Sequence, residues 1–252
     1  MIFVRVIGRI IKRILLWLLA LAAVCSVTLG VMRYRGYLLL SHEANPPAWD
    51  IFGVDVSAYQ GRIDWQGLQQ QGVDFAFLKA TEGSSLQDRY FADNWAGAAE
   101  VGVRTGAYHF FSYDSSGSTQ ADNFIAMVPV TPGALPPVVD IEFYGDKLQN
   151  LPKRGEVKAI LDPLLARLEE HYGQKPILYV TYRSYRLYIA GGEYRDYPLW
   201  FSSPVVAPIG RGWSFWQYSH SARLTGYSGP EEEIDLNVFN GNAAEFQQFG
   251  IT

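Results

Sequence analysis

The sequence predicts an α/β protein whose main domain is a closed, modified TIM-like barrel of eight strands, preceded by a transmembrane helix. Eight short apolar or β-branched runs recur after residue 50, helical patterns occupy several intervals between the early runs, and an uncharged apolar run lies near the N-terminus. Strands that alternate with helices are typical of a parallel sheet, and eight of them favour closure into a barrel. An open doubly wound sheet is the alternative. It would usually bind a nucleotide, and the chain has no GxGxxG or GxxxxGK motif.

The first element is expected to be a membrane anchor over residues 14–32. This segment, ILLWLLALAAVCSVTLGVM, has 19 residues and no charge, which is long enough to cross the hydrocarbon layer of roughly 30 Å as a helix. Four basic residues lie in 1–13 and two follow the run, so the N-terminus should stay cytoplasmic and the domain should lie on the periplasmic or extracellular side. A cleaved signal peptide is the alternative, although its apolar region is normally shorter. Residues 33–50 are expected to be a linker to a domain over 51–252.

Charge and cysteine usage exclude several classes of function. Residues 1–45 hold six of the 21 basic and one of the 25 acidic residues, so the remainder carries 15 basic and 24 acidic side chains. A domain this acidic is a poor candidate for binding nucleic acid. The single cysteine, Cys25, lies in the apolar run, and the four histidines are widely spaced without an HExxH motif. We therefore expect no metal site and no cofactor, and the sequence indicates no partner protein.

The expected strands follow one another at intervals that shorten toward the C-terminus. The first five are 25 to 40 residues apart, which leaves room for a helix in each interval, whereas the last three are close together. They cover residues 51–57, 73–80, 104–111, 136–142, 176–182, 197–203, 213–219 and 233–239. Helical spacing of apolar residues is clearest in 63–72, 89–102 and 153–173. In the last of these, Pro163 predicts a kink or a break.

The fourth expected strand ends on two acidic residues. In PPVVDIE, Asp140 and Glu142 are two residues apart, so a strand directs both side chains to one face. Neighbouring carboxylates repel, which raises the pKa of one member and keeps a proton available near neutral pH. Active sites of such barrels lie at the C-terminal ends of the strands. Asp55 lies late in the first expected strand, and Asp235 lies in the short last one, in EIDLN.

Other polar and aromatic residues near strand ends complete an expected acidic cleft. Aromatic faces stack on sugar rings, and carboxyl groups serve the cleavage of glycosidic bonds, so the cleft suits a carbohydrate. For His109 an interior hydrogen-bonded histidine is an equally good interpretation, and aromatic residues in short strands usually belong to the core. The residues expected to bind substrate are Tyr59, Lys79, Glu82, Tyr108, His109, Tyr179, Trp200, Trp216 and Gln217.

The domain resembles the lysozymes of glycoside hydrolase family 25, the Chalaropsis-type muramidases. The matching stretches, in order, are GVDVSAYQGRIDW, FAFLKATEG, GAYHFF, PPVVDIE, PILYVTY, PLWFSS, FWQYS and IDLNVFNG. The resemblance implies a (β/α)5(β)3 barrel that hydrolyses the β-1,4 bond between N-acetylmuramic acid and N-acetylglucosamine in the glycan strands of peptidoglycan. The segment after Trp200 departs from the family, because Phe201-Ser202-Ser203-Pro204 stands where a small residue and then an aromatic one are usual.

Roles for the four acids follow from the resemblance. Glu142 matches the general acid of the family's Asp-x-Glu motif, and Asp140 matches the partner that supports the developing positive charge. Asp55 and Asp235 match supporting acids. The sequence leaves open whether water is activated directly or the substrate's N-acetyl group attacks. It also leaves two other functions: a chitinase-type hydrolase, which normally shows a longer DxxDxDxE run, and a membrane-tethered glycan-binding protein without catalysis.

Overall fold

Eight strands form a closed barrel in the computed structural model, which describes residues 2–34, 49–204, 206–210 and 212–251. β1 pairs with β2 on one side and with β9 on the other, which closes the ring in the order β1-β2-β4-β5-β6-β7-β8-β9. Every pairing is parallel except those made by β9. The strands are β1 (Phe52–Val56), β2 (Phe75–Glu82), β4 (Arg104–Phe110), β5 (Val138–Ile141), β6 (Ile177–Thr181), β7 (Leu199–Ser202), β8 (Trp213–Ala222) and β9 (Ile234–Phe239).

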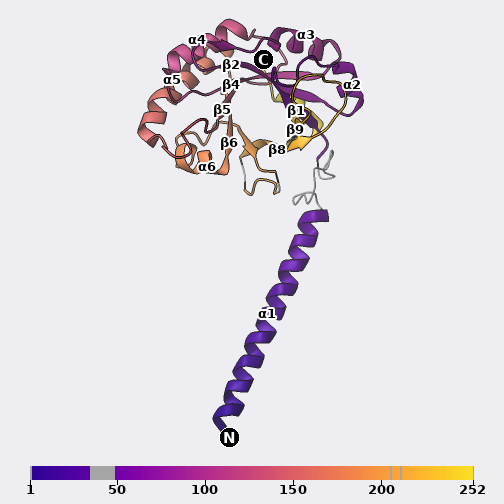
Figure 1. Cartoon of the computed structure of the whole chain (residues 1–252), viewed down its shortest axis with the longest axis vertical. Coiled ribbons are helices and arrows are strands. Elements are labelled where there is room, and N and C mark those ends of the chain that lie inside the picture. Colours follow the sequence, from indigo (N-terminus) through magenta and orange to yellow (C-terminus); the bar gives the residue numbers. More distant parts are fainter. Residues whose placement is uncertain (1, 35–48, 205, 211, 252) are drawn as a thin grey trace.

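Helices follow the first five strands and cover the outside of the barrel (Figure 1). They are α2 (Trp65–Gln70), α3 (Phe91–Glu100), α4 (Gly117–Met127), α5 (Arg154–Tyr172) and the short α6 (Tyr182–Ser184), which continues into the π-helical turn η1 (Tyr185–Ile189). Among the residues that the structure describes, no helix lies between the last three strands, so the predicted (β/α)5(β)3 fold class is confirmed. A two-residue strand, β3 (Leu86–Gln87), folds back on the end of β2.

Two of the helices differ from the sequence-based expectation. α5 runs unbroken through Pro163, so the expected break does not occur, because one buried apolar face holds both halves of the helix against its neighbours. The first residue of α4, Gly117, lies so close to α5 that an added Cβ would be 1.8 Å from the carbonyl oxygen of Ile160. The fold class includes a helix in the interval of α4, but its apolar spacing does not show where it lies, because Gln120 and Asn123 are on its buried face.

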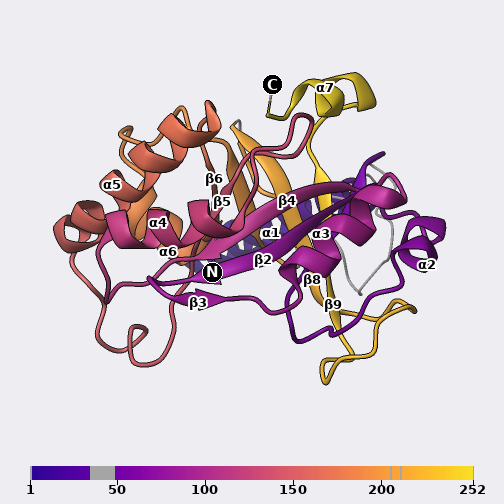
Figure 2. The ribbon, with the colours of Figure 1, turned by 90° about the horizontal axis from the view of Figure 1, so that it is seen from above.

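The strands divide the core into an inner and an outer layer. Phe75 and Phe77 on β2 point into the barrel, whereas Ala76 and Leu78 pack outside it against the helices. The C-terminal helix α7 (Ala243–Gln248) lies across one end of the barrel (Figure 2), where Phe246 contacts Phe75. This packing closes the N-terminal end of the parallel strands and leaves their C-terminal end for a site.

The N-terminal segment is one long helix, α1 (Ile2–Tyr34). Its stretch Ile10–Met32 is long and apolar enough to cross a membrane, and it begins four residues before the span that the sequence predicts. Large apolar side chains along it are exposed; Trp17, for example, is 76% exposed. Most of the linker expected over 33–50 lies outside the described residues.

Candidate active site

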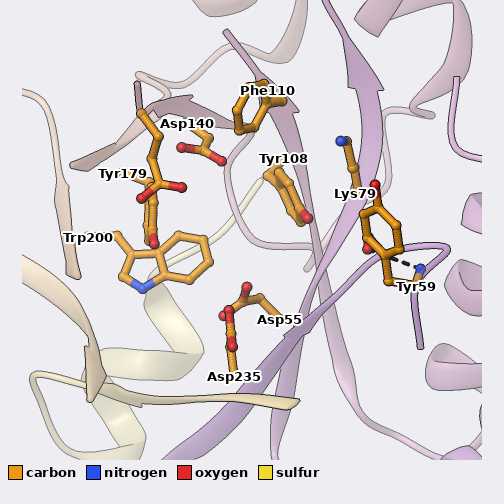
Figure 3. Close-up of a pocket in the computed structure, with 11 residues that line it drawn as sticks. Asp55, Tyr59, Lys79, Tyr108, Phe110, Asp140, Tyr179, Trp200 and Asp235 are labelled. Atoms are coloured by element: carbon orange, nitrogen blue, oxygen red, sulfur yellow. Dashed lines mark hydrogen bonds between the residues drawn. The ribbon is translucent and has the colours of Figure 1, made fainter. Parts of the chain in front are cut away.

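A cleft of about 200 Å³ opens at the C-terminal end of the parallel strands (Figure 3). Four carboxyl groups share it with one lysine, several aromatic rings and a serine. The lining residues are Asp55, Ser57, Tyr59, Lys79, Tyr108, Phe110, Asp140, Glu142, Tyr179, Trp200 and Asp235. Seven of the eight barrel strands, or the residues directly after them, therefore contribute to one site.

β5 delivers Asp140 and Glu142 to this cleft. Asp140 lies in the strand and is only 7% exposed, and Glu142 is the first residue after the strand ends. Burial, followed by the charges of Glu142 and Asp55, raises the pKa of Asp140 well above its ordinary value. Burial and the charge of Asp55 raise the pKa of Glu142 to about 7, and the Tyr179 hydroxyl would oppose the rise only when it donates its proton to Glu142. One oxygen of Asp140, Oδ1, has no hydrogen-bond partner among the described residues.

Asp55 and Asp235 form a second carboxyl pair, because β9 runs antiparallel to β1 and sets these residues directly opposite each other. Burial and then the charge of Asp55 raise the pKa of Asp235 to about 9. The pKa of Asp55 is raised by burial, while hydrogen bonds from its neighbours lower it. At neutral pH Asp235 therefore holds a proton, which it shares with Asp55 in a hydrogen bond.

Two buried amides hold this second pair in place. Gln217 Nε2 donates to Asp55 Oδ2 at 2.9 Å and to Asp235 Oδ2 at 3.0 Å. Asn237 Nδ2 donates to Asp55 Oδ2 at 2.7 Å, and its Oδ1 accepts from the Trp200 indole at 2.9 Å. The indole bond fixes the orientation of the Asn237 amide, so its NH₂ group faces the carboxylate.

Aromatic rings form the floor and rim of the cleft. Trp200 stacks on Phe77 of the inner core with ring centroids 4.5 Å apart, and its edge meets Tyr179. On the rim, Tyr59 is 64% exposed, which leaves its ring free to stack on a sugar. Lys79 completes the wall, 2.7 Å from Glu82 Oε2 and 5.1 Å from the centre of the Phe110 ring.

The structure brings most of the predicted site residues together. The four acids line the cleft, as do Tyr59, Lys79, Tyr108, Tyr179 and Trp200. Glu82 lines two neighbouring hollows instead of the cleft, and it forms an ion pair with the cleft residue Lys79. Gln217 is buried behind the acids and contacts them rather than the open cleft.

Two predicted substrate-binding residues lie elsewhere. His109 is fully buried on the outer face of β4, where its ring nitrogens bond to Thr81 and Gln120, and burial lowers its pKa to about 4. Trp216 is also fully buried on the outer face of its strand, and its indole donates to the carbonyl oxygen of Ser203. His109 is adjacent in its strand to the inward-facing Tyr108, and Trp216 is adjacent to the inward-facing Gln217. The period-two rule, applied to each strand, would therefore have assigned both residues to the outer face.

Sequence reasoning also missed cleft residues. Asn237 lies two residues after Asp235 on β9, and the rule that groups Asp140 with Glu142 would have found it. Ser57 also lines the cleft two residues after Asp55, and Phe110 two residues after Tyr108. Their residue types alone do not point to a site. Within the described part of the chain, no group of three or more histidine, cysteine or acidic side chains has the arrangement of a metal site.

Comparison with known proteins relates this geometry to a family. Residues 54–227 match the family model described as glycosyl hydrolases family 25. A solved family 25 glycosyl hydrolase from Bacillus anthracis is 48% identical with a TM-score of 0.77, and the match covers 83% of this chain and 99% of that one. Lysozyme M1 of Streptomyces globisporus is 33% identical over 205 residues, which are 76% of this chain and 68% of that protein. The uncharacterized protein YegX of Escherichia coli K12 is 38% identical over 212 residues, 81% of this chain and 75% of that protein.

The raised pKa of Asp235 predicts how stability depends on pH. The folded state holds a proton up to about pH 9 that the unfolded chain releases near its ordinary pKa of 3.8, so Asp235 lowers stability increasingly as the pH rises between these values. Asp235→Asn keeps the hydrogen bonds without ionising. At pH 7 it should stabilise the domain by at least about 1 kcal/mol, or roughly 2–4 °C in Tm.

Thermal melts of the two proteins from pH 4 to pH 8 measure this effect. The gain should shrink to a few tenths of a kcal/mol at pH 4, close to the ordinary pKa of 3.8, where about 40% of the unfolded chains also hold the Asp235 proton. Asp196→Asn, at a side chain that is 69% exposed, is the control and should change Tm little at any pH. A variant Asp235→Asn that is no more stable than the parent at pH 7 would contradict a protonated Asp235.

Proposed function

The chain belongs to glycosyl hydrolases family 25, and we propose that it hydrolyses peptidoglycan by proton donation from Glu142 with support from Asp140. The activity is that of a lysozyme, a muramidase that cleaves the β-1,4 bond between N-acetylmuramic acid and N-acetylglucosamine. The observation that carries the proposal is one cleft holding a carboxyl group with a pKa of about 7 beside a buried second one. That combination provides an acid that is still protonated near neutral pH.

Glu142 is the proton donor in this proposal. Its ordinary pKa of 4.5 would leave it ionised at pH 7, whereas a pKa of about 7 leaves about half of the molecules protonated. In the cleft the acid form gives its proton to the glycosidic oxygen as the bond to the sugar breaks. The lost proton leaves a carboxylate that can remove one from the incoming water or hydroxyl group, which returns the site to its starting state.

Asp140 supports the reacting sugar. Its Oδ1 atom is buried without a partner among the described residues, so a polar group of the substrate is needed to satisfy it. The acetamido N–H of the muramic acid residue is such a group. A bond to it would hold that sugar in place, and the dipole of the Asp140 carboxyl group, or its charge once ionised, would stabilise the positive charge that develops at the anomeric carbon.

The remaining groups bind and shape the substrate. Asp55 contributes a charge that raises the pKa of Glu142, and Asp235 keeps Asp55 in place through their shared proton. Tyr59, Tyr108 and Trp200 offer faces and edges to sugar rings along the cleft. The family membership favours this muramidase function over the chitinase-type and non-catalytic alternatives, because the matched model describes glycosyl hydrolases and a matched relative is a lysozyme.

Replacing the proton donor tests the assignment. Glu142→Gln keeps the shape and hydrogen-bonding capacity of the side chain but cannot give up a proton, so turnover should fall by about 10²–10⁴-fold. Release of reducing ends from purified peptidoglycan measures turnover, and co-sedimentation with the same material measures binding, which should persist. Glu170→Gln on the exposed face of α5 is the matched control.

Three results would contradict this proposal. Turnover by Glu142→Gln close to that of the parent would show that another group donates the proton. Reducing ends released by the parent from chitin, and none from peptidoglycan, would favour the chitinase-type alternative. Failure of the parent to cleave either polymer while still binding one would favour a glycan-binding protein.

We further propose that α1 stays attached and anchors the domain at the outer face of a membrane, next to its polymeric substrate. The apolar stretch Ile10–Met32 is long enough to span a bilayer. Four basic residues lie in 1–13, before residues 14–32, whereas only two lie in 33–50, directly after them. This charge bias orients the N-terminus toward the cytoplasm and the barrel toward the wall.

Fractionation of the full chain produced in a bacterial host tests the anchor. The protein should remain in carbonate-washed membranes, and its intact mass should include residues 1–34. Protease added from outside should digest the domain. A control in which a cleavable signal peptide replaces residues 1–48 should release the domain in soluble form. Recovery of the parent as a soluble protein that lacks residues 1–34 would identify the segment as a signal peptide instead.

A further inference from the structure

The buried amide of Gln217 links the two halves of the site. Its Oε1 atom accepts hydrogen bonds from the Tyr179 hydroxyl at 2.8 Å and the Ser202 hydroxyl at 2.9 Å. Its Nε2 atom gives both of its hydrogens to the pair Asp55 and Asp235. An amide turned over would put two carboxyl oxygens against its own oxygen, so these four partners fix its orientation.

The Tyr179 hydroxyl stands between Gln217 and Glu142 and has only one proton. Glu142 lies within hydrogen-bonding reach of this hydroxyl, so the two acceptors compete for the same proton. When the proton points to Gln217, the tyrosine oxygen can only accept a bond from Glu142, which requires Glu142 to be protonated. When the proton turns to Glu142, it stabilises the carboxylate instead.

We propose that Gln217 is a positioning residue that holds the Tyr179 proton and thereby favours the acid form of Glu142. The inference rests on the proposed role of Glu142 and adds the group that keeps it ready to donate. Gln217 acts without touching the substrate, because it is buried behind the acids. The Ser202 hydroxyl supports it from the next strand by filling the second lone pair of Oε1.

Other groups around Glu142 also affect its protonation, and they come from nearly every strand. β7 and β8 contribute the uncharged Trp200 and Gln217. The titratable groups that face the cleft are Asp55 on β1, Lys79 on β2, Tyr108 on β4, Asp140 on β5, Tyr179 on β6 and Asp235 on β9. Gln217 is hydrogen-bonded to three of them: Tyr179, Asp55 and Asp235. The test must therefore separate an effect of Gln217 on Glu142 through Tyr179 from an effect through the two aspartates.

A titration of the Glu142 carboxyl carbon by NMR in the free protein provides that test. The signal is assigned by its absence in Glu142→Gln, and the titration does not depend on turnover, so it stays informative if the proposed function fails. Gln217→Met, of similar length and without hydrogen-bonding groups, frees the Tyr179 proton. The midpoint of Glu142 should then fall by about one pH unit, a tenfold change in its proton affinity.

Tyr179→Phe separates the two paths and does not depend on Gln217→Met folding. Because the tyrosine proton already points to Gln217, its removal should leave the Glu142 midpoint unchanged or lower it. In the Tyr179→Phe background, Gln217→Met should then cause no further fall. Tyr172→Phe, which removes a buried hydroxyl bonded to the carbonyl oxygen of Val128 where α5 packs on α4, is the matched control and should leave the midpoint near that of the parent.

Three results would overturn the inference. A midpoint that rises in Tyr179→Phe would mean that the hydroxyl donates to Glu142 in the parent. An equal fall on Gln217→Met with and without the tyrosine hydroxyl would mean that the effect passes through Asp55 and Asp235. An unchanged midpoint in a folded Gln217→Met protein would leave Gln217 with a structural role alone.

Discussion

The burial of four carboxyl groups at one end of the barrel is the constraint on which the site depends. Water would stabilise each charge separately, but a shared, partly desolvated cleft cannot keep all four ionised near neutral pH. The pKa values of Asp55, Asp140, Glu142 and Asp235 are all raised, and burial is the largest cause for each. Some of these carboxyl groups therefore remain protonated near neutral pH. Acid catalysis of glycoside cleavage needs such a protonated group in the cleft.

The antiparallel strand β9 makes this arrangement possible. Seven parallel strands direct their C-terminal residues to one end, and β9 enters from that same end, so Asp235 near its start lies opposite Asp55 on β1. The resulting pair shares a proton, and the charge of Asp55 raises the pKa of both Asp140 and Glu142 at the end of β5. Closure of the barrel and the acidity of Glu142 thus depend on the same pairing of strands.

Much of the fold and the four acids could be predicted because each strand is a short apolar run that ends in turn residues. The period-two rule places Asp140 beside Glu142, and the family resemblance adds Asp55 and Asp235. His109 matches the interior hydrogen-bonded alternative, and strand alternation, more than residue type, decides that it and Trp216 face away from the cleft. The position of α4 is not apparent from apolar spacing, because its buried face carries amides that bond to His109 and to a loop. The network around Gln217 could not be predicted, since it joins residues from five strands whose register the sequence does not reveal.

The pH dependence of kcat/KM on purified peptidoglycan tests the central claim most directly. If Glu142 donates the proton from its buried position, the rate should fall about tenfold per pH unit above about pH 7, because the acid form is lost there. This alkaline limb should disappear, together with most of the activity, in Glu142→Gln. A rate that stays level up to pH 9, or one that already falls near the ordinary glutamate value of 4.5, would contradict a site organised to retain that proton.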